Sequence, residues 1–348
     1  MLSTNIILAI VMVVGQFVYG PLGLTFQKQP ASGLQKGISF TAWGSYVYQT
    51  PQADASLVNI SQTGADWVSL IVTQYQPDIH STQIQPERYT PNDASLEHAI
   101  QAAHRIGLKV LLKPHVDLSA DPEHWRGQIG IHFTSAQWEE WFTSYRQFIL
   151  HYARLAERSG VDEFCAGTEL TATQSHAASW RKVIASVRQV YHGPVVYAAN
   201  FGDEYFISWW DALDLIGVDA YYPLSLQRSP TIADMKTSWD LIGIYLETLA
   251  VRENRPILFT EIGYRSMRGA ASWPGDYWTA GPADPQLQAD AYQAAFESLF
   301  DKPWFAGMFW WDWGAGSRMG GVQDAGYTPQ NKPALDVLTR WYTGAAGG

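Results

Sequence analysis

The sequence is poor in cysteine and in charge. Its 348 residues include one cysteine, Cys165, and only 16% of them are Asp, Glu, Lys or Arg. A single cysteine excludes an intramolecular disulfide. Because Cys165 lies inside an apolar run, we expect a packed thiol and not a nucleophile. Hydrophobic residues make up 47% of the chain, which is enough to form one large core.

Runs of basic residues are also missing. The chain has 33 acidic and 23 basic residues, and its formal net charge is -10. Nucleic acids bind to positive protein surfaces, so we expect no nucleic-acid partner. The same argument disfavours an anionic polymer as substrate and leaves neutral substrates open.

Long apolar runs are absent except at the N terminus. Residues 6–18 are almost wholly apolar, a length that is short for a membrane span and typical of an export-signal core. Residues 1–5 lack the Lys or Arg that export signals usually carry. We predict that residues 1–35 are an export signal or a membrane anchor with a polar tether; a packed segment or a misassigned start is the alternative. The protein is then secreted or anchored at the cell surface, and any membrane association involves only this segment.

From residue 37 onward, short apolar runs alternate with longer amphipathic segments. This order predicts parallel strands joined by helices. The expected strands are residues 37–42, 67–73, 109–115, 163–168, 195–199, 215–221, 257–261 and 305–311. Eight such units over residues 36–345 predict an α/β protein with a single-domain (β/α)8 TIM barrel.

The segments between these strands carry helix signals. Thr134 and Gln137 form a capping box before a helix at 138–159, and Asn92 or Asp93 precedes a helix at 94–106. Other helices are expected at residues 54–63, 172–191, 204–213, 231–251, 285–300 and 331–342.

Two glutamates each stand at the end of a predicted strand, Glu169 after the fourth and Glu261 in the seventh. Barrel enzymes carry their chemistry at the carboxyl ends of the strands, so the two side chains are predicted to face each other across the barrel mouth. A buried carboxyl is costly unless it is paired or used. Paired carboxylates perform glycoside hydrolysis. The alternative is that both glutamates form buried ion pairs with Lys113 or Arg265.

Other polar and aromatic residues at the strand ends are candidates for substrate contact, because aromatic rings stack on the C–H faces of sugars. These candidates are Trp43, Lys113, His115, Asn200, Tyr221, Tyr222, Trp311 and Trp313. Three choices stay open: Lys113 binds sugar hydroxyls or a strand carboxylate, Asn200 contacts sugar or shapes a turn, and each Trp stacks on sugar or packs in the core. Asp219 lies deeper and is predicted to be structural.

Four motifs stand at the expected strand ends, namely Gly167-Thr168-Glu169-Leu170, Asp219-Ala220-Tyr221-Tyr222-Pro223, Thr260-Glu261-Ile262-Gly263-Tyr264 and Phe309-Trp310-Trp311-Asp312-Trp313. Over about residues 36–343 the chain resembles glycoside hydrolase family 113, whose members are retaining β-mannanases. The resemblance implies that Glu169 is the acid/base and Glu261 the nucleophile. The wider clan usually has Asn before the acid/base, as a contact to the sugar 2-hydroxyl; here Thr168 takes that position.

The chemistry requires the two glutamates to differ in protonation. We expect donors such as a Tyr hydroxyl of the sixth strand or His115 to hold Glu261 ionised, and we expect Glu169 to have a raised pKa. The resemblance to family 113 implies that the substrate is a β-1,4-mannan or a mannooligosaccharide. The enzyme is expected to be a monomer, and no cofactor or metal is expected.

Three alternatives remain. The first is a retaining enzyme of the same fold acting on another neutral β-glycan, such as glucan or galactan. The second is a barrel that binds carbohydrate without cleaving it. The third is a metal-dependent hydrolase that uses His115 and Asp117 with His124 or His132.

Overall fold

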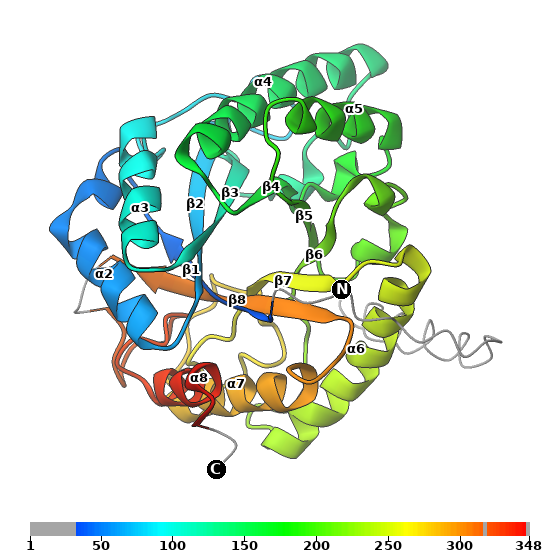
Figure 1. Cartoon of the computed structure of the whole chain (residues 1–348). Coiled ribbons are helices and arrows are strands. Elements are labelled where there is room, and N and C mark those ends of the chain that lie inside the picture. The colour runs from blue at the N-terminus through cyan, green and yellow to red at the C-terminus, as the bar shows by residue number, and fades with distance from the viewer. Residues whose placement is uncertain (1–32, 316–318, 346–348) are drawn as a thin grey trace.

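Eight parallel strands close into a barrel in chain order, with β1 paired to β8. The computed structural model describes residues 33–315 and 319–345. The strands are β1 Gln35–Thr41, β2 Trp67–Gln76, β3 Lys109–Leu118, β4 Glu163–Thr168, β5 Val195–Asn200, β6 Leu215–Asp219, β7 Ile257–Ile262 and β8 Phe305–Gly314. The helices enclose this ring (Figure 1). The predicted (β/α)8 barrel and its eight strands are therefore confirmed. The predicted export signal or anchor falls almost wholly in residues 1–32, outside the described residues.

The helices of the described residues are α2 Pro51–Gln62, α3 Asp93–Arg105, α4 Ser135–Ser159, α5 Ala177–Arg188, α6 Ile232–Glu253, α7 Pro285–Leu299 and α8 Pro333–Thr343. Their first turns follow the sequence signals. Thr134 and Gln137 cap α4 reciprocally, and the Asn92 side chain accepts a hydrogen bond from the Ser95 amide at the start of α3.

Two helix predictions were wrong in part or whole. Residues 204–213 contain two short 3-10 turns, η4 Glu204–Phe206 and η5 Trp210–Ala212, in place of one helix. The adjacent Trp209 and Trp210 are both fully buried, and their indole N–H groups donate to the Gln174 and Glu204 carbonyls. A regular helix turns neighbouring side chains about 100° apart, so it would not bury both rings in this way. Similarly, α5 begins only at Ala177, because a 3-10 turn at Thr171–Thr173 precedes it.

A compact apolar cluster fills the barrel interior. It consists of Trp67, Leu111, Cys165, Val196, Ala198, Leu258 and Phe309, all contributed by strands. Cys165 is a buried free thiol, as predicted. A second and larger core lies between the strands and the helices. Because inward and outward side chains alternate along a strand, Lys113 and His115 follow Leu111 on the inward face of β3, each closer to the barrel mouth.

The described part of the chain contains no helix that is both long enough and apolar enough to span a membrane.

A glycine at the contact between β5 and β6 tests the barrel packing. A Cβ atom on Gly217 would lie 2.3 Å from the backbone oxygen of Tyr197, whereas one on Gly243 in α6 would meet nothing closer than 3.9 Å. We expect Gly217→Ala to lower the free energy of unfolding by about 1–3 kcal/mol, because a strand backbone must move. Gly243→Ala should instead be neutral or stabilise by about 0.5–1 kcal/mol. Urea denaturation of both variants measures this difference, and equal effects would contradict the packing described.

Candidate active site

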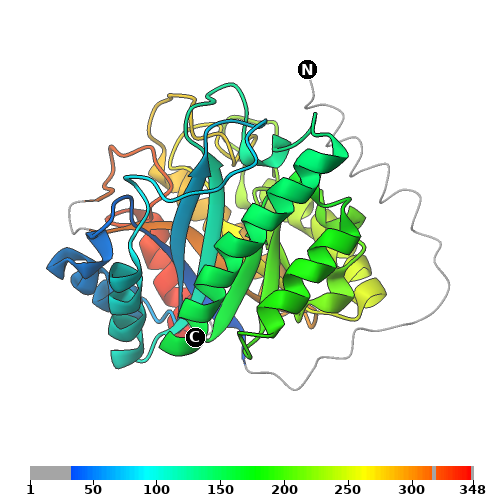
Figure 2. The same ribbon diagram turned by 90° about the horizontal axis from the view of Figure 1, so that it is seen from above.

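The loops that follow the strands gather at one end of the barrel, at the top of Figure 2, where the loop after β7 is gold. Glu169 comes directly after β4, and Glu261 lies in β7. Both side chains are at this end. The residues around them come from β3, β6 and β8 and from the loops after β3 and β7.

Glu261 is surrounded by donors. Its Oε1 lies 2.5 Å from the Lys113 ammonium, and its Oε2 accepts a 2.7 Å hydrogen bond from the Tyr221 hydroxyl. The Nε2 atom of His115 lies 3.8 Å from Oε1, which is beyond hydrogen-bonding distance. The predicted Tyr donor from the sixth strand is confirmed, since Tyr221 lies two residues after the end of β6.

Lys113 joins two carboxylates. Besides Glu261, its ammonium contacts Asp219 at 2.7 Å, and both Lys113 and Asp219 are fully buried. Burial opposes the charge, but the two carboxylates outweigh it and raise the pKa of Lys113. The Thr260 hydroxyl also donates to Asp219 at 2.7 Å. Of the two options for Lys113, pairing with strand carboxylates is the one found, and Asp219 is structural as predicted.

Glu169 is in a different environment. Its backbone φ is 54°, in the left-handed region that costs a non-glycine residue about 1–2 kcal/mol. Its side chain is 16% exposed, and one oxygen lies 3.7 Å from the Arg126 guanidinium. Burial raises the pKa of Glu169 to about 8; Asp219 adds to the shift and Arg126 opposes it. The expected raised pKa is confirmed, so Glu169 is mostly protonated at neutral pH.

Sequence reasoning missed Arg126, which lies in the 3-10 turn η2 Arg126–Gln128 of the loop after β3. One guanidinium nitrogen is 2.9 Å from His115 Nδ1, and the other donates to Asp117 at 2.8 Å. The side chain is 19% exposed. Only its position in the loop after β3, the strand that carries the His115-x-Asp117 motif, marked it in the sequence, because a loop residue has no periodicity to reveal its direction.

Two predicted aromatic contacts lie at the mouth with exposed surface. Trp43, in the loop after β1, is 51% exposed, and Trp311 near the end of β8 is partly exposed. Next to Trp311, the Asp312 carboxylate accepts a 3.0 Å hydrogen bond from the Thr41 hydroxyl. Burial raises the pKa of Asp312 to about 6.

Three of the predicted contact residues have buried side chains in this structure, and a fourth takes part in a turn. The Tyr222 side chain is fully buried, with its hydroxyl bonded to Glu204 and its ring against Trp239. Trp313 and Thr168 are buried, and the Thr168 hydroxyl faces the Cys165 sulfur at 3.8 Å. The Asn200 amide donates to the Phe201 carbonyl, which is the turn role left open for it. Short apolar runs do not reveal how far each strand-end side chain is buried.

The loop after β7 brings further aromatic rings to the mouth. Arg265 anchors it by donating to the carbonyls of Asp276 and Thr279. Between these anchors, Tyr277 and Trp278 are mostly exposed, and their rings lie 4.5 Å apart. Burial raises the pKa of Tyr277, and Asp117 adds to this shift, with Glu169 contributing less.

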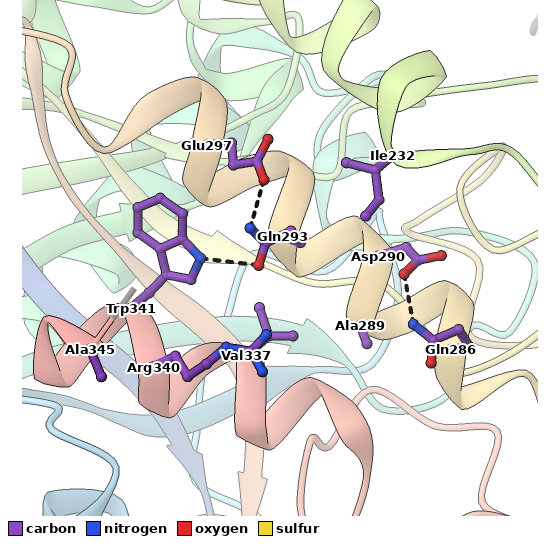
Figure 3. Close-up of a pocket in the computed structure, with 10 residues that line it drawn as sticks. All are labelled: Ile232, Gln286, Ala289, Asp290, Gln293, Glu297, Val337, Arg340, Trp341 and Ala345. Carbon is purple, nitrogen blue, oxygen red and sulfur yellow. Dashed lines mark hydrogen bonds between the residues drawn. The ribbon is translucent and has the colours of Figure 1, made fainter. Parts of the chain in front are cut away.

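A separate pocket of about 650 Å³ lies outside the barrel between α7, α8 and the start of α6. Figure 3 shows that its polar side chains bond to each other: Gln293 bridges Glu297 and Trp341, and Gln286 bonds to Asp290. No strand-end residue lines this pocket. The barrel mouth, and not this pocket, holds the carboxyl pair.

The residues of the metal alternative are engaged in other contacts. His115 and Asp117 both contact Arg126, and His124 contacts Asp121. His132 stacks on His80. Across residues 33–315 and 319–345, no group of three His, Cys, Asp or Glu side chains is placed to hold a metal ion.

Comparison with known proteins agrees with this site. The sequence model described as Glycoside Hydrolase Family 113 matches residues 39–332. The chain belongs to glycoside hydrolase family 113. This family 113 enzyme has its Glu169, Glu261 and barrel mouth inside the matched range. A search among curated proteins gave no match.

Solved structures resemble this family 113 enzyme over nearly its whole described length. A family 113 β-mannanase from Alicyclobacillus acidocaldarius is 32% identical, with a TM-score of 0.80 over 90% of this chain and 98% of that one. A family 113 β-1,4-mannanase is 29% identical, with a TM-score of 0.81 over 89% and 99% of the two chains. A family 5 mannosidase from Rhizomucor miehei, at 14% identity and a TM-score of 0.61, shares the fold alone.

The ion cluster at Lys113 generates a stability prediction. Lys113→Met leaves Asp219 and Glu261 buried beside each other without a cation, so we expect the free energy of unfolding to fall by about 3–5 kcal/mol. Adding Asp219→Asn removes one of the two charges and should recover part of the loss. Urea denaturation of the two variants measures both effects. A double variant no more stable than Lys113→Met would contradict the cluster.

Proposed function

We propose that this enzyme is a retaining endo-β-1,4-mannanase in which Glu261 is the nucleophile and Glu169 the acid/base. The observation that carries the proposal is the contrast between the two carboxyl groups. Glu261 accepts hydrogen bonds from Lys113 and Tyr221, which suit a carboxylate, whereas burial keeps Glu169 protonated near neutral pH. A retaining glycosidase needs this division of roles.

In the first step, a Glu261 oxygen attacks the anomeric carbon and forms a C–O bond as the glycosidic C–O bond breaks. Glu169 transfers its proton to the departing oxygen. The leaving sugar is then an alcohol, and the remaining sugar is an ester of Glu261. The positive charge of Arg126, 3.7 Å from Glu169, compensates the new carboxylate charge.

In the second step, a water molecule attacks the anomeric carbon of the ester. Glu169 accepts the proton of the water, and the bond to Glu261 breaks. Both glutamates return to their starting states. Two inversions at one carbon give net retention of configuration.

The substrate class is supported by the relatives and by the shape of the mouth. Both family 113 structures are named as β-mannanases, at 29% and 32% identity. Rings with exposed surface lie around the mouth, at Trp43, Trp311, Tyr277 and Trp278. Such rings stack on successive neutral sugars, and a chain with net charge -10 would repel an anionic polymer.

A product profile tests the substrate class. We expect β-1,4-mannan and mannooligosaccharides to be cleaved to β-anomers, with at best weak action on xylan and no effect of a chelator. Chromatography and proton NMR of products from mannan, glucan, galactan and xylan measure this. Preferential cleavage of glucan or galactan would agree with the proposed mechanism but contradict mannan as the substrate. Binding of a polysaccharide without turnover would instead identify a carbohydrate-binding barrel.

The nucleophile is tested by Glu261→Ala. We expect turnover of all β-glycosides to fall by about 10⁴-fold or more, because the covalent route is lost. Azide can enter the vacated space and attack activated aryl glycosides, so added azide should restore some activity and yield the inverted glycosyl azide. The substitution Glu261→Gln keeps the volume of the side chain and leaves no space for azide, so azide should not restore its activity. Strong residual hydrolysis by Glu261→Ala without azide would remove Glu261 from this role.

The acid/base is tested by the pH profile. Glu169 can donate its proton only below its pKa of about 8, so kcat/KM on mannooligosaccharides should fall as the pH rises through about 8. Glu169→Ala should reduce this kcat/KM by about 10²–10⁴-fold. The loss should be much smaller on dinitrophenyl glycosides, whose leaving group needs no proton. Equal losses on both substrates would show that Glu169 is not the acid.

We also propose that the enzyme is a monomer, secreted or anchored at the cell surface. The support for its location is the apolar run at residues 6–18, and an extracellular location suits a polymeric substrate. Cell fractionation tests the location, and light scattering of the purified protein tests the monomer.

A further inference from the structure

His115 has one buried ring nitrogen that uses no partner. The imidazole lies beside Glu261 and is buried, yet its Nε2 has no hydrogen-bond partner among the described residues. Most buried polar atoms in folded proteins are hydrogen-bonded, and an unpaired one costs free energy. A partner that arrives with the substrate would remove this cost.

The contact with Arg126 fixes the protonation of this imidazole. A guanidinium has only N–H donors, so His115 Nδ1, 2.9 Å from Arg126, must accept and carries no proton. The proton of the neutral ring is then on Nε2. Burial lowers the pKa of His115 well below its usual range, and the charges of Arg126 and Lys113 lower it further, so the ring stays neutral. His115 therefore presents an Nε2–H donor 3.8 Å from the nucleophile oxygen.

The end of β4 offers no free donor to a sugar beside Glu169. Thr168, directly before Glu169, is buried, and its hydroxyl faces the Cys165 sulfur. The nucleophile attacks the anomeric carbon, and the 2-hydroxyl is on the neighbouring carbon. A donor that points beside Glu261 is therefore in position to reach this hydroxyl.

We propose that Arg126 is a positioning residue that holds His115 in its neutral, Nε2-protonated form, and that this N–H donates to the 2-hydroxyl of the sugar being cleaved. The proposal rests on the function of Glu169 and Glu261 given above. The Arg126 guanidinium has a second effect under this proposal. Its positive charge lies 3.7 Å from Glu169 and favours the Glu169 carboxylate that forms in the first step.

The form of His115 is measured without substrate. In the wild-type enzyme, ¹⁵N NMR of labelled histidine should show His115 with a protonated Nε2 and an unprotonated Nδ1, identified by its loss in His115→Gln. In Arg126→Met this preference should weaken or reverse. A protonated Nδ1 in the folded wild-type enzyme overturns the proposal, whether or not the enzyme acts on mannan.

The contact with the 2-hydroxyl is measured with two activated aryl substrates, a β-mannoside and its 2-deoxy analogue. We expect His115→Gln and Arg126→Met each to lose about 10²-fold in kcat/KM on the mannoside and about tenfold less on the 2-deoxy substrate. Equal losses on both substrates overturn the contact. If the wild-type enzyme cleaves neither substrate, the proposed function fails, and the NMR result still stands as the test of the positioning.

The effect on Glu169 is measured by the pH profile of the variants. The groups that act on this carboxyl are Asp219, Arg126, Glu261, Lys113 and Tyr277. Removing a positive charge raises the pKa of an acid, so Arg126→Met should move the alkaline limb upward by about 1 pH unit. Arg126→Lys keeps the positive charge but lacks the several N–H donors of a guanidinium. The alkaline limb of its pH profile should therefore stay in place while kcat/KM falls.

The control is Arg158→Met, which removes one positive charge from an exposed ion pair on α4. It should change neither the limb nor the ratio between the two substrates. If the alkaline limb of the pH profile of Arg126→Met stays in place or moves to lower pH, the proposed effect of Arg126 on the Glu169 carboxyl is overturned. Thermal melts establish that each variant is folded; if Arg126→Met is not, Arg126→Lys and the wild-type spectrum decide.

Discussion

The active end of this barrel depends on the Lys113 ammonium between Asp219 and Glu261. Three charged side chains meet where the barrel interior is closed to water, and each would be costly to bury alone. The lysine compensates both carboxylates and holds Glu261 toward the mouth. Because the ammonium is fully buried between these two carboxylates, it is not accessible to a sugar, and substrate recognition falls to other groups.

The alternation of side chains along β3 connects the interior core to the chemistry. Leu111 belongs to the apolar cluster in the barrel, and Lys113, His115 and Asp117 follow on the same face, each one step closer to the mouth. Along β3, the inward side chains thus first pack in the core, then compensate charge, and finally lie beside the substrate. Arg126, in the loop after β3, contacts His115 and Asp117.

Two chemically identical side chains differ here because their neighbours differ. Glu261 lies among an ammonium, a phenol and an imidazole, whereas Glu169 is buried with one guanidinium at 3.7 Å and with the Asp219 charge acting against its ionisation. Burial and like charge raise one pKa without any change in residue type. Arg126 links the two groups, since it contacts His115 beside Glu261 and also lies near Glu169.

The sequence by itself determined the barrel, its eight strands, most of its helices and the two glutamates at strand ends, because all of these follow from periodicity and short motifs. It left open whether Lys113 binds sugar or carboxylate, and it placed Tyr222, Trp313 and Thr168 at the mouth. Only the tertiary structure decided these points, because local register and irregular strand ends direct each side chain toward the mouth or the core. Arg126 and Tyr277 reach the site from loops, and no periodicity in the chain encodes where a loop side chain will lie.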